Sequence, residues 1–356
     1  MKVIKILIIL ITCIIIGMPT TKAESKKTSG IVMDLTTGRI LYDNQSNKKQ
    51  LIASTTKIMT AIIAIEQGDL NEKIIIGNEI LKMYGTNIYI EVGEKIKLID
   101  LLYGLLLRSG NDAAIAIATA ISNTEEEFVN EMHKMAEKLG MKNTVFENPH
   151  GLDEETKNYS TAYDMAILMK YANKNKIYKK ISSTTKYETK TTNKIYLWYN
   201  RNKLLTNYEY CTGGKNGYTP SAGKTLVTTA KKNEMELVAV TLNDNNIYET
   251  QKKLYEKIFN DYQNYKIIDK ENFFIDKNFI NIEYYLKQDF VYPLTKEEID
   301  EIVTVVKINN KDSKKIGVID IFLSEKKIGS IPIYRKKTEK KGVNKLLKKI
   351  KLFIFR

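Results

Sequence analysis

The apolar positions of the chain change period along its length, and this change predicts the elements of the fold. Strand-like runs occupy 30–35 and 39–43, and Thr36-Thr37-Gly38 between them has the composition of a hairpin turn. Apolar residues at helical spacing then predict helices at 53–65, 98–107, 112–121, 125–139 and 161–172. Three closely spaced strands follow, at about 211–218, 224–230 and 236–242, before a helix at 247–260.

Strands joined by tight turns pair as an antiparallel meander. We therefore predict an α+β fold with one antiparallel sheet, in which the first two strands join the last three. The Tyr-, Thr- and Asn-rich stretch 182–210 predicts no clear element. Beyond residue 262 the character changes, and short alternating runs at 302–308, 316–323 and 327–333 predict a small β domain. The expected domains are thus 24–262 and 263–335.

The first 23 residues have the composition of an export signal. Lys2 and Lys5 precede an apolar run from Ile6 to Met18, and small residues lie at positions 21 and 23. This is the plan of a secretory signal peptide cleaved after Ala23. An uncleaved membrane anchor is the alternative, although the apolar run is short for a full span. The chain is therefore expected to be exported.

The other end of the chain is strongly basic. Ten Lys and Arg residues and a single acid, Glu339, fall in 335–356, which accounts for most of the formal net charge of +14. Apolar residues at 343, 346, 347, 350, 353 and 354 follow helical spacing. We expect 336–356 to form a basic amphipathic helix on an anionic membrane surface; a disordered basic end is the alternative. Nucleic acid is a poor partner for an exported chain.

Cysteine and histidine are too scarce for several kinds of site. Cys13 falls in the expected signal, so Cys211 is alone in the mature chain and no intrachain disulfide is possible. His133 and His150 are the two histidines, which disfavours a histidine–cysteine metal site and a serine–histidine–acid triad. We expect no metal and no cofactor.

A serine and a lysine at the start of the first predicted helix are candidates for nucleophilic chemistry. In Ser54-Thr55-Thr56-Lys57, the serine and the lysine lie one turn apart on one helix face. A desolvated lysine amine can be neutral and can then serve as a base. A helix N-terminus also favours negative charge on an acyl oxygen. Taken alone, the motif could equally be an N-cap serine with a surface lysine.

Two further motifs follow in the same chain. Ser109-Gly110-Asn111 joins two predicted apolar helices, where the serine could relay a proton and the asparagine could bind a peptide; a capped turn is the alternative. Lys215-Asn216-Gly217 could bring a cation to a substrate carboxylate, and the glycine would let a substrate strand lie against the sheet edge. A surface lysine entering a turn is the alternative there.

The three motifs, in this order, resemble those of penicillin-binding proteins and β-lactamases. Segments around them, such as Gly104–Ala114 and Met135–Leu152, resemble long stretches of the low-molecular-mass penicillin-binding proteins that are serine D-alanyl-D-alanine carboxypeptidases. The resemblance covers 28 to about 260 and implies a β-lactamase/transpeptidase-like fold. It also implies peptidoglycan stem peptides ending in D-Ala-D-Ala as substrates and β-lactam antibiotics as ligands.

The resemblance also implies a role for each matching residue. Ser54 corresponds to the acylated nucleophile and Lys57 to its base, while Ser109 corresponds to a proton relay. Substrate-binding roles fall to Asn111, Lys215, Asn216, Gly217, Tyr218 and, in a supporting position, Arg201. The backbone N–H groups of Ser54 and Tyr218 would form the oxyanion hole. Asn216 replaces the usual threonine, and Glu236 falls where relatives commonly carry arginine.

Three hypotheses of function remain at this point. The leading one is a D-Ala-D-Ala carboxypeptidase on the outer face of the cytoplasmic membrane, where its tail would hold it. A β-lactamase would use similar motifs, but the chain offers no clear loop glutamate for deacylation and the hypothesis leaves the β domain and tail unexplained. A catalytically weak protein that binds or organises the cell wall is the third, suggested by Asn216.

Overall fold

The computed structural model describes residues 28–276, 282–309 and 313–336. The expected signal peptide lies outside these residues, and so do 337–356 of the expected amphipathic tail. The chain forms two compact units. Among the described residues, one unit comprises those from 28 to 33 together with Ile40–Ala230 and Leu237–Leu254. The other comprises Asp34–Arg39, Lys231–Glu236 and the described residues from Tyr255 to 336. The boundary expected near residue 262 follows the end of helix α9 (Ile247–Asp261).

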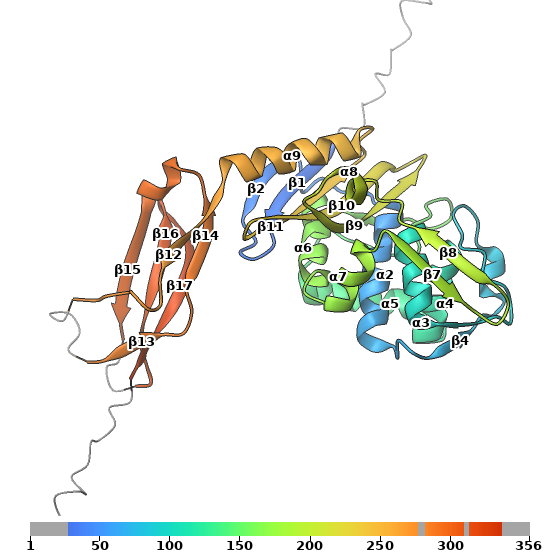
Figure 1. The fold of residues 1–356 in the computed structure, drawn as a ribbon, viewed down its shortest axis with the longest axis horizontal. Helices are drawn as coiled ribbons and strands as arrows, with labels where there is room; N and C mark the ends of the chain where they lie inside the picture. Colours follow the sequence, from blue (N-terminus) through green and yellow to red (C-terminus); the bar gives the residue numbers. More distant parts are fainter. Residues whose placement is uncertain (1–27, 277–281, 310–312, 337–356) are drawn as a thin grey trace, which may run out of the picture. The chain divides into compact units, whose positions relative to one another are not determined.

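A five-stranded antiparallel sheet is the framework of the first unit (Figure 1). Its strand order is β2-β1-β11-β10-β9, which confirms the prediction that the first two strands join the last three. The strands are β1 (Ser29–Asp34), β2 (Ile40–Asn44), β9 (Cys211–Thr219), β10 (Gly223–Lys232) and β11 (Met235–Leu242). Because β9 is the last strand in this order, the Lys215-Asn216-Gly217 segment lies on an edge strand.

Helices cover this sheet because its inner strands are apolar on both faces. Along β11 the residues from Leu237 to Leu242 are all buried. On one face α9 contributes Gln251, whose amide donates hydrogen bonds to the carbonyls of Leu226 and Ala239. The other helices of the unit are α2 (Lys57–Gln67), α3 (Leu98–Tyr103), α4 (Asn111–Ser122), α5 (Glu125–Leu139), α6 (Ala162–Ala172), α7 (Lys176–Ser183) and α8 (Leu204–Asn207).

The predicted helices are confirmed in position, and one of them is wrong in form. The apolar stretch 98–107 is not one α-helix: α3 ends at Tyr103, and Gly104–Arg108 continue as a π-helical turn. Residues 182–210 contain α8 and a hairpin of β7 (Lys186–Lys190) and β8 (Ile195–Tyr199), which the sequence did not predict. In β8 the side chains of Tyr196 and Trp198 are buried, and the exposed residues between and beside them are also apolar or aromatic, so the sequence shows no period of two.

Short elements complete the first unit. The two-stranded pairs are β3 (Gln50–Leu51) with β6 (Tyr159–Ser160) and β4 (Lys73–Ile75) with β5 (Lys95–Lys97). Two 3₁₀ segments are η1 (Ala53–Thr56) and η2 (Asn78–Lys82). In the described parts of the chain, no helix has both the length and the apolar character needed to cross a membrane.

The second unit is built mostly of strands. A four-stranded sheet has the order β13-β17-β16-β15, and β12 pairs with β14 in a separate ladder. Buried isoleucines such as Ile319 and Ile331 form its core. The three strands predicted here are confirmed as β15 (Ile302–Ile308), β16 (Lys315–Leu323) and β17 (Lys326–Arg335), whereas β12 (Gln263–Ile268), β13 (Tyr284–Leu286) and β14 (Phe290–Leu294) were not predicted.

Candidate active site

Ser54 lies on the 3₁₀ turn η1, which leads directly into α2. Side chains three residues apart eclipse one another in a 3₁₀ turn, so the Ser54 and Lys57 side chains share one side of the turn. The Lys57 Nζ lies 3.1 Å from the Ser54 Oγ. The preceding residue, Ala53, has a φ of +47°, a conformation that non-glycine residues seldom adopt. The backbone is therefore held in an unusual conformation directly before the candidate nucleophile.

Lys57 is fully buried, and its other two contacts are with carbonyl oxygens. Its Nζ donates to the Asn111 Oδ1 at 2.8 Å and to the His150 carbonyl at 2.6 Å. Burial lowers the pKa of Lys57 well below its usual value, the nearby Lys215 cation lowers it further, and Asp112 partly opposes this. The amine is thereby shifted toward the neutral form that a base requires.

The Ser109-Gly110-Asn111 turn follows the π-helical segment. Ser109 is buried and has a left-handed backbone conformation with φ of +67°. Its N–H donates to the Gly104 carbonyl, which closes the π-helical turn. Asn111 begins α4, and its amide Nδ2 donates to the Tyr84 carbonyl at 2.7 Å. The Asn111 Oδ1 accepts a hydrogen bond from the Lys57 Nζ. Both ends of the Asn111 amide are therefore hydrogen-bonded, which fixes its orientation.

The third motif lies on the edge strand β9. Lys215 is fully buried, and its Nζ donates to the Asn216 carbonyl at 2.6 Å. Burial and the charge of Arg201 lower the pKa of Lys215 to about 7. Gly217 runs against the nucleophile turn: a Cβ on this glycine would lie 2.7 Å from the Ser54 backbone nitrogen. The strand and the turn thus approach as closely as a glycine permits.

The remaining predicted residues are more exposed than Lys57 and Lys215. Asn216 is half-buried and Tyr218 is 63% exposed. Both line a cavity of about 510 Å³ that also includes Lys203 and Lys224. Arg201 is exposed, and its guanidinium donates to the Thr86 Oγ1 at 3.0 Å. Glu236 belongs to the second unit, at the start of β11, where its carbonyl accepts from the Leu35 N–H.

The structure adds residues around Lys57 to which the sequence analysis assigned no role. In the 148–151 turn, the Asn148 Oδ1 accepts from the N–H groups of His150 and Gly151. The Asn158 Nδ2 in turn donates to the Asn148 carbonyl and to the Thr56 Oγ1, both at 2.9 Å. Asn158 therefore ties the turn that holds Lys57 to the residue directly before Lys57. The sequence signal was an asparagine-rich segment, which alone does not specify this contact.

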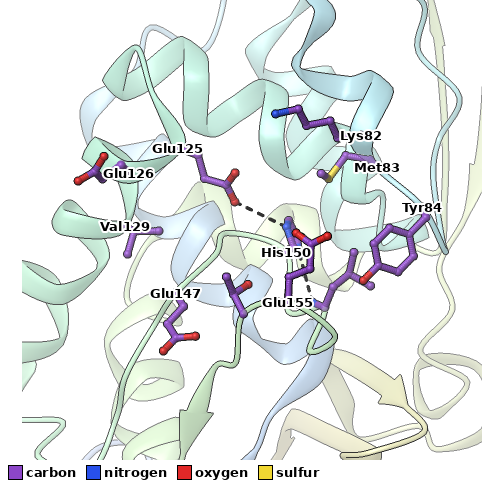
Figure 2. A pocket seen from close by; sticks show the side chains of 11 residues that line it. Lys82, Met83, Tyr84, Glu125, Glu126, Val129, Glu147, His150 and Glu155 are labelled. Carbon is purple, nitrogen blue, oxygen red and sulfur yellow. Dashed lines mark hydrogen bonds and ion pairs between the residues drawn. The ribbon is translucent and has the colours of Figure 1, made fainter.

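The His150 side chain faces a cavity of about 610 Å³ on the other side of this turn. Figure 2 shows its ring directed toward the Glu125 carboxylate, and the His150 Nε2 lies 3.7 Å from the Glu125 Oε1. The other ring nitrogen, Nδ1, accepts from the Leu152 N–H. Burial, with the Lys57 cation as a second cause, lowers the pKa of His150 to about 3, so the ring is neutral at physiological pH.

The geometry supports acyl transfer through serine. A hydroxyl next to a buried lysine amine, at the start of a helix and beside an open strand edge, is an arrangement for attack on a carbonyl. Within residues 28–276, 282–309 and 313–336, no group of three or more His, Cys, Asp or Glu side chains could hold a metal ion. The fold and this site define the class of the penicillin-binding serine peptidases.

Comparison with known proteins places the chain within that class. Residues 17–246 match the family model of the D-alanyl-D-alanine carboxypeptidases, peptidase family S11, and the chain belongs to this family. This confirms the resemblance and the α+β fold expected from the sequence. The roles of the individual site residues stay predictions.

Two relatives and one solved structure illustrate the similarity. The chain is 38% identical over 230 residues to D-alanyl-D-alanine carboxypeptidase DacF of Bacillus subtilis, covering 63% of this chain but only 59% of DacF. It is 26% identical over 339 residues to DacD of Escherichia coli, covering 86% and 84%. Penicillin binding protein 5 from Haemophilus influenzae superposes with a TM-score of 0.72 at 26% identity, covering 86% and 95%.

Proposed function

We propose that the protein is a serine-type D-Ala-D-Ala carboxypeptidase, which removes the terminal D-alanine from peptidoglycan stem peptides through an acyl-enzyme on Ser54. The observation that carries the proposal is the contact of the Ser54 hydroxyl with a buried lysine amine whose other partners are both carbonyls. Membership in the D-alanyl-D-alanine carboxypeptidase family supports the choice of substrate.

The hydrogen-bonding partners of Lys57 determine whether Ser54 donates a proton to it or accepts one from it. A neutral amine has two N–H groups and one lone pair. The Asn111 Oδ1 and the His150 carbonyl can only accept, so they take the two N–H groups. The lone pair is then left for the Ser54 hydroxyl, 3.1 Å away, which becomes the donor. Neutral Lys57 would thus draw the proton from Ser54.

Acylation follows from this arrangement. The Ser54 Oγ would attack the carbonyl carbon of the penultimate D-alanine as its proton passes to Lys57. The backbone N–H groups of Ser54 and Tyr218 would stabilise the oxyanion. The C–N bond then breaks, the leaving nitrogen takes up a proton relayed through Ser109, and D-alanine departs as a neutral amine. Water attacks the ester in the second step, which releases the shortened peptide and restores the Ser54 hydroxyl.

Substrate binding would use the open edge of β9. The stem peptide would lie as an added strand along β9, which is the last strand of the five-stranded sheet. Asn111 would contact the peptide amide, while Lys215 and Arg201 would supply positive charge for the terminal carboxylate. Asn216, where the family usually has threonine, can also donate a hydrogen bond to that carboxylate.

The same residues would make the protein a target for β-lactam antibiotics, which would acylate Ser54. We place it outside the cytoplasmic membrane, after cleavage of residues 1–23 and with the basic segment 336–356 on the anionic lipid surface. The composition of both ends supports this placement.

The test combines a covalent label with product release. Purified protein is treated with a fluorescent penicillin, denatured, and the labelled peptide is mapped by mass spectrometry; separately, D-alanine release from diacyl-Lys-D-Ala-D-Ala is measured. We expect the label on Ser54 and expect S54A to lose both label and release. Full turnover by S54A would overturn the assignment of the nucleophile.

The same experiment separates the other functions. Rapid hydrolysis of nitrocefin without peptide turnover would indicate a β-lactamase instead. A folded protein that takes no label and releases no D-alanine would indicate a cell-wall binding or organising protein.

A further inference from the structure

We propose that the protein has a second binding site: a lysine-rich cleft, formed by β4, β5, and β7 with its following turn, that binds the phosphate groups of a phosphodiester polymer. The cleft has a volume of about 520 Å³ and lies in the first unit. Figure 1 shows β4 and the β7–β8 hairpin within the same unit. The proposal takes from the proposed function only the location in the cell envelope.

Four lysines from three strands line the cleft. Lys73 lies on β4, Lys95 and Lys97 lie on β5, and Lys190 ends β7. All four side chains are exposed. Asp100 is the single acid among the lining residues, so four lysines leave the lining with a formal net charge of +3.

The register of the β4–β5 pair makes this charge unfavourable for the empty protein. Lys73 is directly opposite Lys97, and the buried pair Ile74 and Ile96 next to it fixes that register. The Lys73 and Lys97 side chains therefore lie on the same face of the β4–β5 pair. Like charges directly opposite each other in a sheet are destabilising. A bound anion would turn this repulsion into two attractive contacts.

The protein itself does not neutralise these lysines. In the part of the chain that the structure describes, none of the four is within ion-pair distance of a carboxylate, whereas Lys194 pairs with Glu91 and Lys134 with Glu131 elsewhere on the same unit. The Asp100 carboxylate accepts a 2.5 Å hydrogen bond from the Tyr187 hydroxyl. The positive charge thus remains available for an external ligand.

The shape and donors of the cleft favour phosphate groups in series. Lys95 and Lys97 are two residues apart on one strand face, about 7 Å along the strand. This is of the same order as the separation of neighbouring phosphates along an extended phosphodiester chain. Thr189, Thr191 and Thr192 also line the cleft. The hydroxyls of Thr191 and Thr192 already donate within the protein, to Glu94 and Asn193, so the lysines are the main donors to a ligand. Lysine binds phosphate as a point charge and tolerates a flexible chain. A polyol phosphate polymer of the cell envelope fits these requirements.

The experiment measures binding of poly(glycerol phosphate) to the full chain. The variant K73Q/K95Q/K97Q/K190Q removes the cleft lysines. The matched control K142Q/K157Q/K174Q/K180Q removes the same charge from exposed positions elsewhere on the same unit. Since both retain the basic segment 336–356, its contribution to polymer binding cancels in the comparison.

We expect the cleft variant to bind the polymer about tenfold more weakly, with a salt dependence reduced by about 2 in log–log slope, and the control to change less than about twofold. Equal weakening of both variants, or of neither, would overturn the proposal. Binding to phosphatidylglycerol vesicles is measured in parallel. If the cleft variant binds the vesicles more weakly but binds the polymer as wild type does, the cleft binds lipid and the proposal is wrong.

Penicillin acylation of Ser54 is measured on the same preparations. We expect it to be unchanged in both variants, which shows that they are folded. If wild-type protein takes no penicillin label but binds the polymer through the cleft lysines, the proposed function is wrong and the polymer-binding site is supported. If labelling is normal and the cleft variant binds the polymer as well as wild type does, only the proposal of a polymer-binding site is wrong.

Discussion

The Gly217 Cα lies so close to the Ser54 backbone nitrogen that a Cβ on the glycine would be 2.7 Å from that nitrogen. The same Cβ would lie 2.6 Å from the Thr225 Oγ1 on the paired strand β10. Real Cβ atoms do not approach backbone atoms this closely. The edge strand and the nucleophile turn are therefore in register only with glycine at this position.

We predict that G217A lowers the rate of penicillin acylation about 100-fold, because the added methyl group would push β9 away from Ser54, and small displacements of reacting groups are costly. Stopped-flow or gel-based acylation kinetics measure this, and the midpoint of thermal unfolding serves as the control for folding. An acylation rate within twofold of wild type would show that the strand can move without affecting the nucleophile.

The Asn111 side chain is a neutral hydrogen-bond partner of Lys57, the predicted base. Replacing it by aspartate would put a negative charge about 2.8 Å from the Lys57 Nζ. A nearby carboxylate favours the charged amine and raises its pKa. We therefore predict that N111D shifts the acidic limb of the acylation–pH profile upward by about 1–2 pH units. Acylation rates measured from pH 5 to 10 test this, and an unshifted limb would contradict Lys57 as the base.

We infer that Asn158 positions Lys57 through the 148–151 turn, whose His150 carbonyl accepts from the Lys57 Nζ. N158A would remove the donors to Thr56 and to the Asn148 carbonyl. We predict an acylation rate about 10-fold to 100-fold lower and an unfolding free energy lower by about 1–3 kcal/mol, because buried partners lose their hydrogen bonds.

A purely structural role for Asn158 would lower stability without changing the pH profile of the protein that remains folded. We expect that profile to shift, because the His150 carbonyl would no longer hold Lys57 in place. N173A, which replaces a half-buried asparagine at the end of α6, is the comparison variant. If the two variants have the same acylation profile, the positioning role is wrong.

His150 makes stability depend on pH in the acidic range. Its pKa is about 3 in the folded protein, below the usual 6.5, so between these values the unfolded chain binds a proton that the folded protein does not. Stability is therefore lost as pH falls from about 6.5 toward 3. Between pH 7 and pH 5 we predict a loss of about 2 kcal/mol from this group.

Urea unfolding at the two pH values tests the prediction, with H150Q as the comparison. Glutamine does not titrate, so the variant is expected to lose about 2 kcal/mol less than wild type over this interval. An identical pH dependence in both proteins would mean that His150 becomes protonated in the folded state.

The sequence by itself determined the order of the elements and the identity of the motifs. Apolar periodicity is a local property, so it located strands such as β9 and helices such as α5 within a few residues. The spacing of Ser54 and Lys57 is also local, and one helical turn brings them together wherever the helix lies. The prediction that they are a nucleophile and its base came from the presence of all three motifs in one chain. Membership in the D-alanyl-D-alanine carboxypeptidase family supports that prediction.

Only the tertiary structure decided the environment of the base. The Asn111 amide and the His150 carbonyl reach Lys57 from 54 and 93 residues away in the chain. Such contacts depend on how α4 and the 148–151 turn pack around α2, and no local pattern encodes them. The same holds for the cleft: Lys73 and Lys97 are unremarkable in a lysine-rich sequence until strand register sets them opposite each other. Burial and register are properties of the packed chain, and they set the pKa of Lys57 and the charge of the cleft.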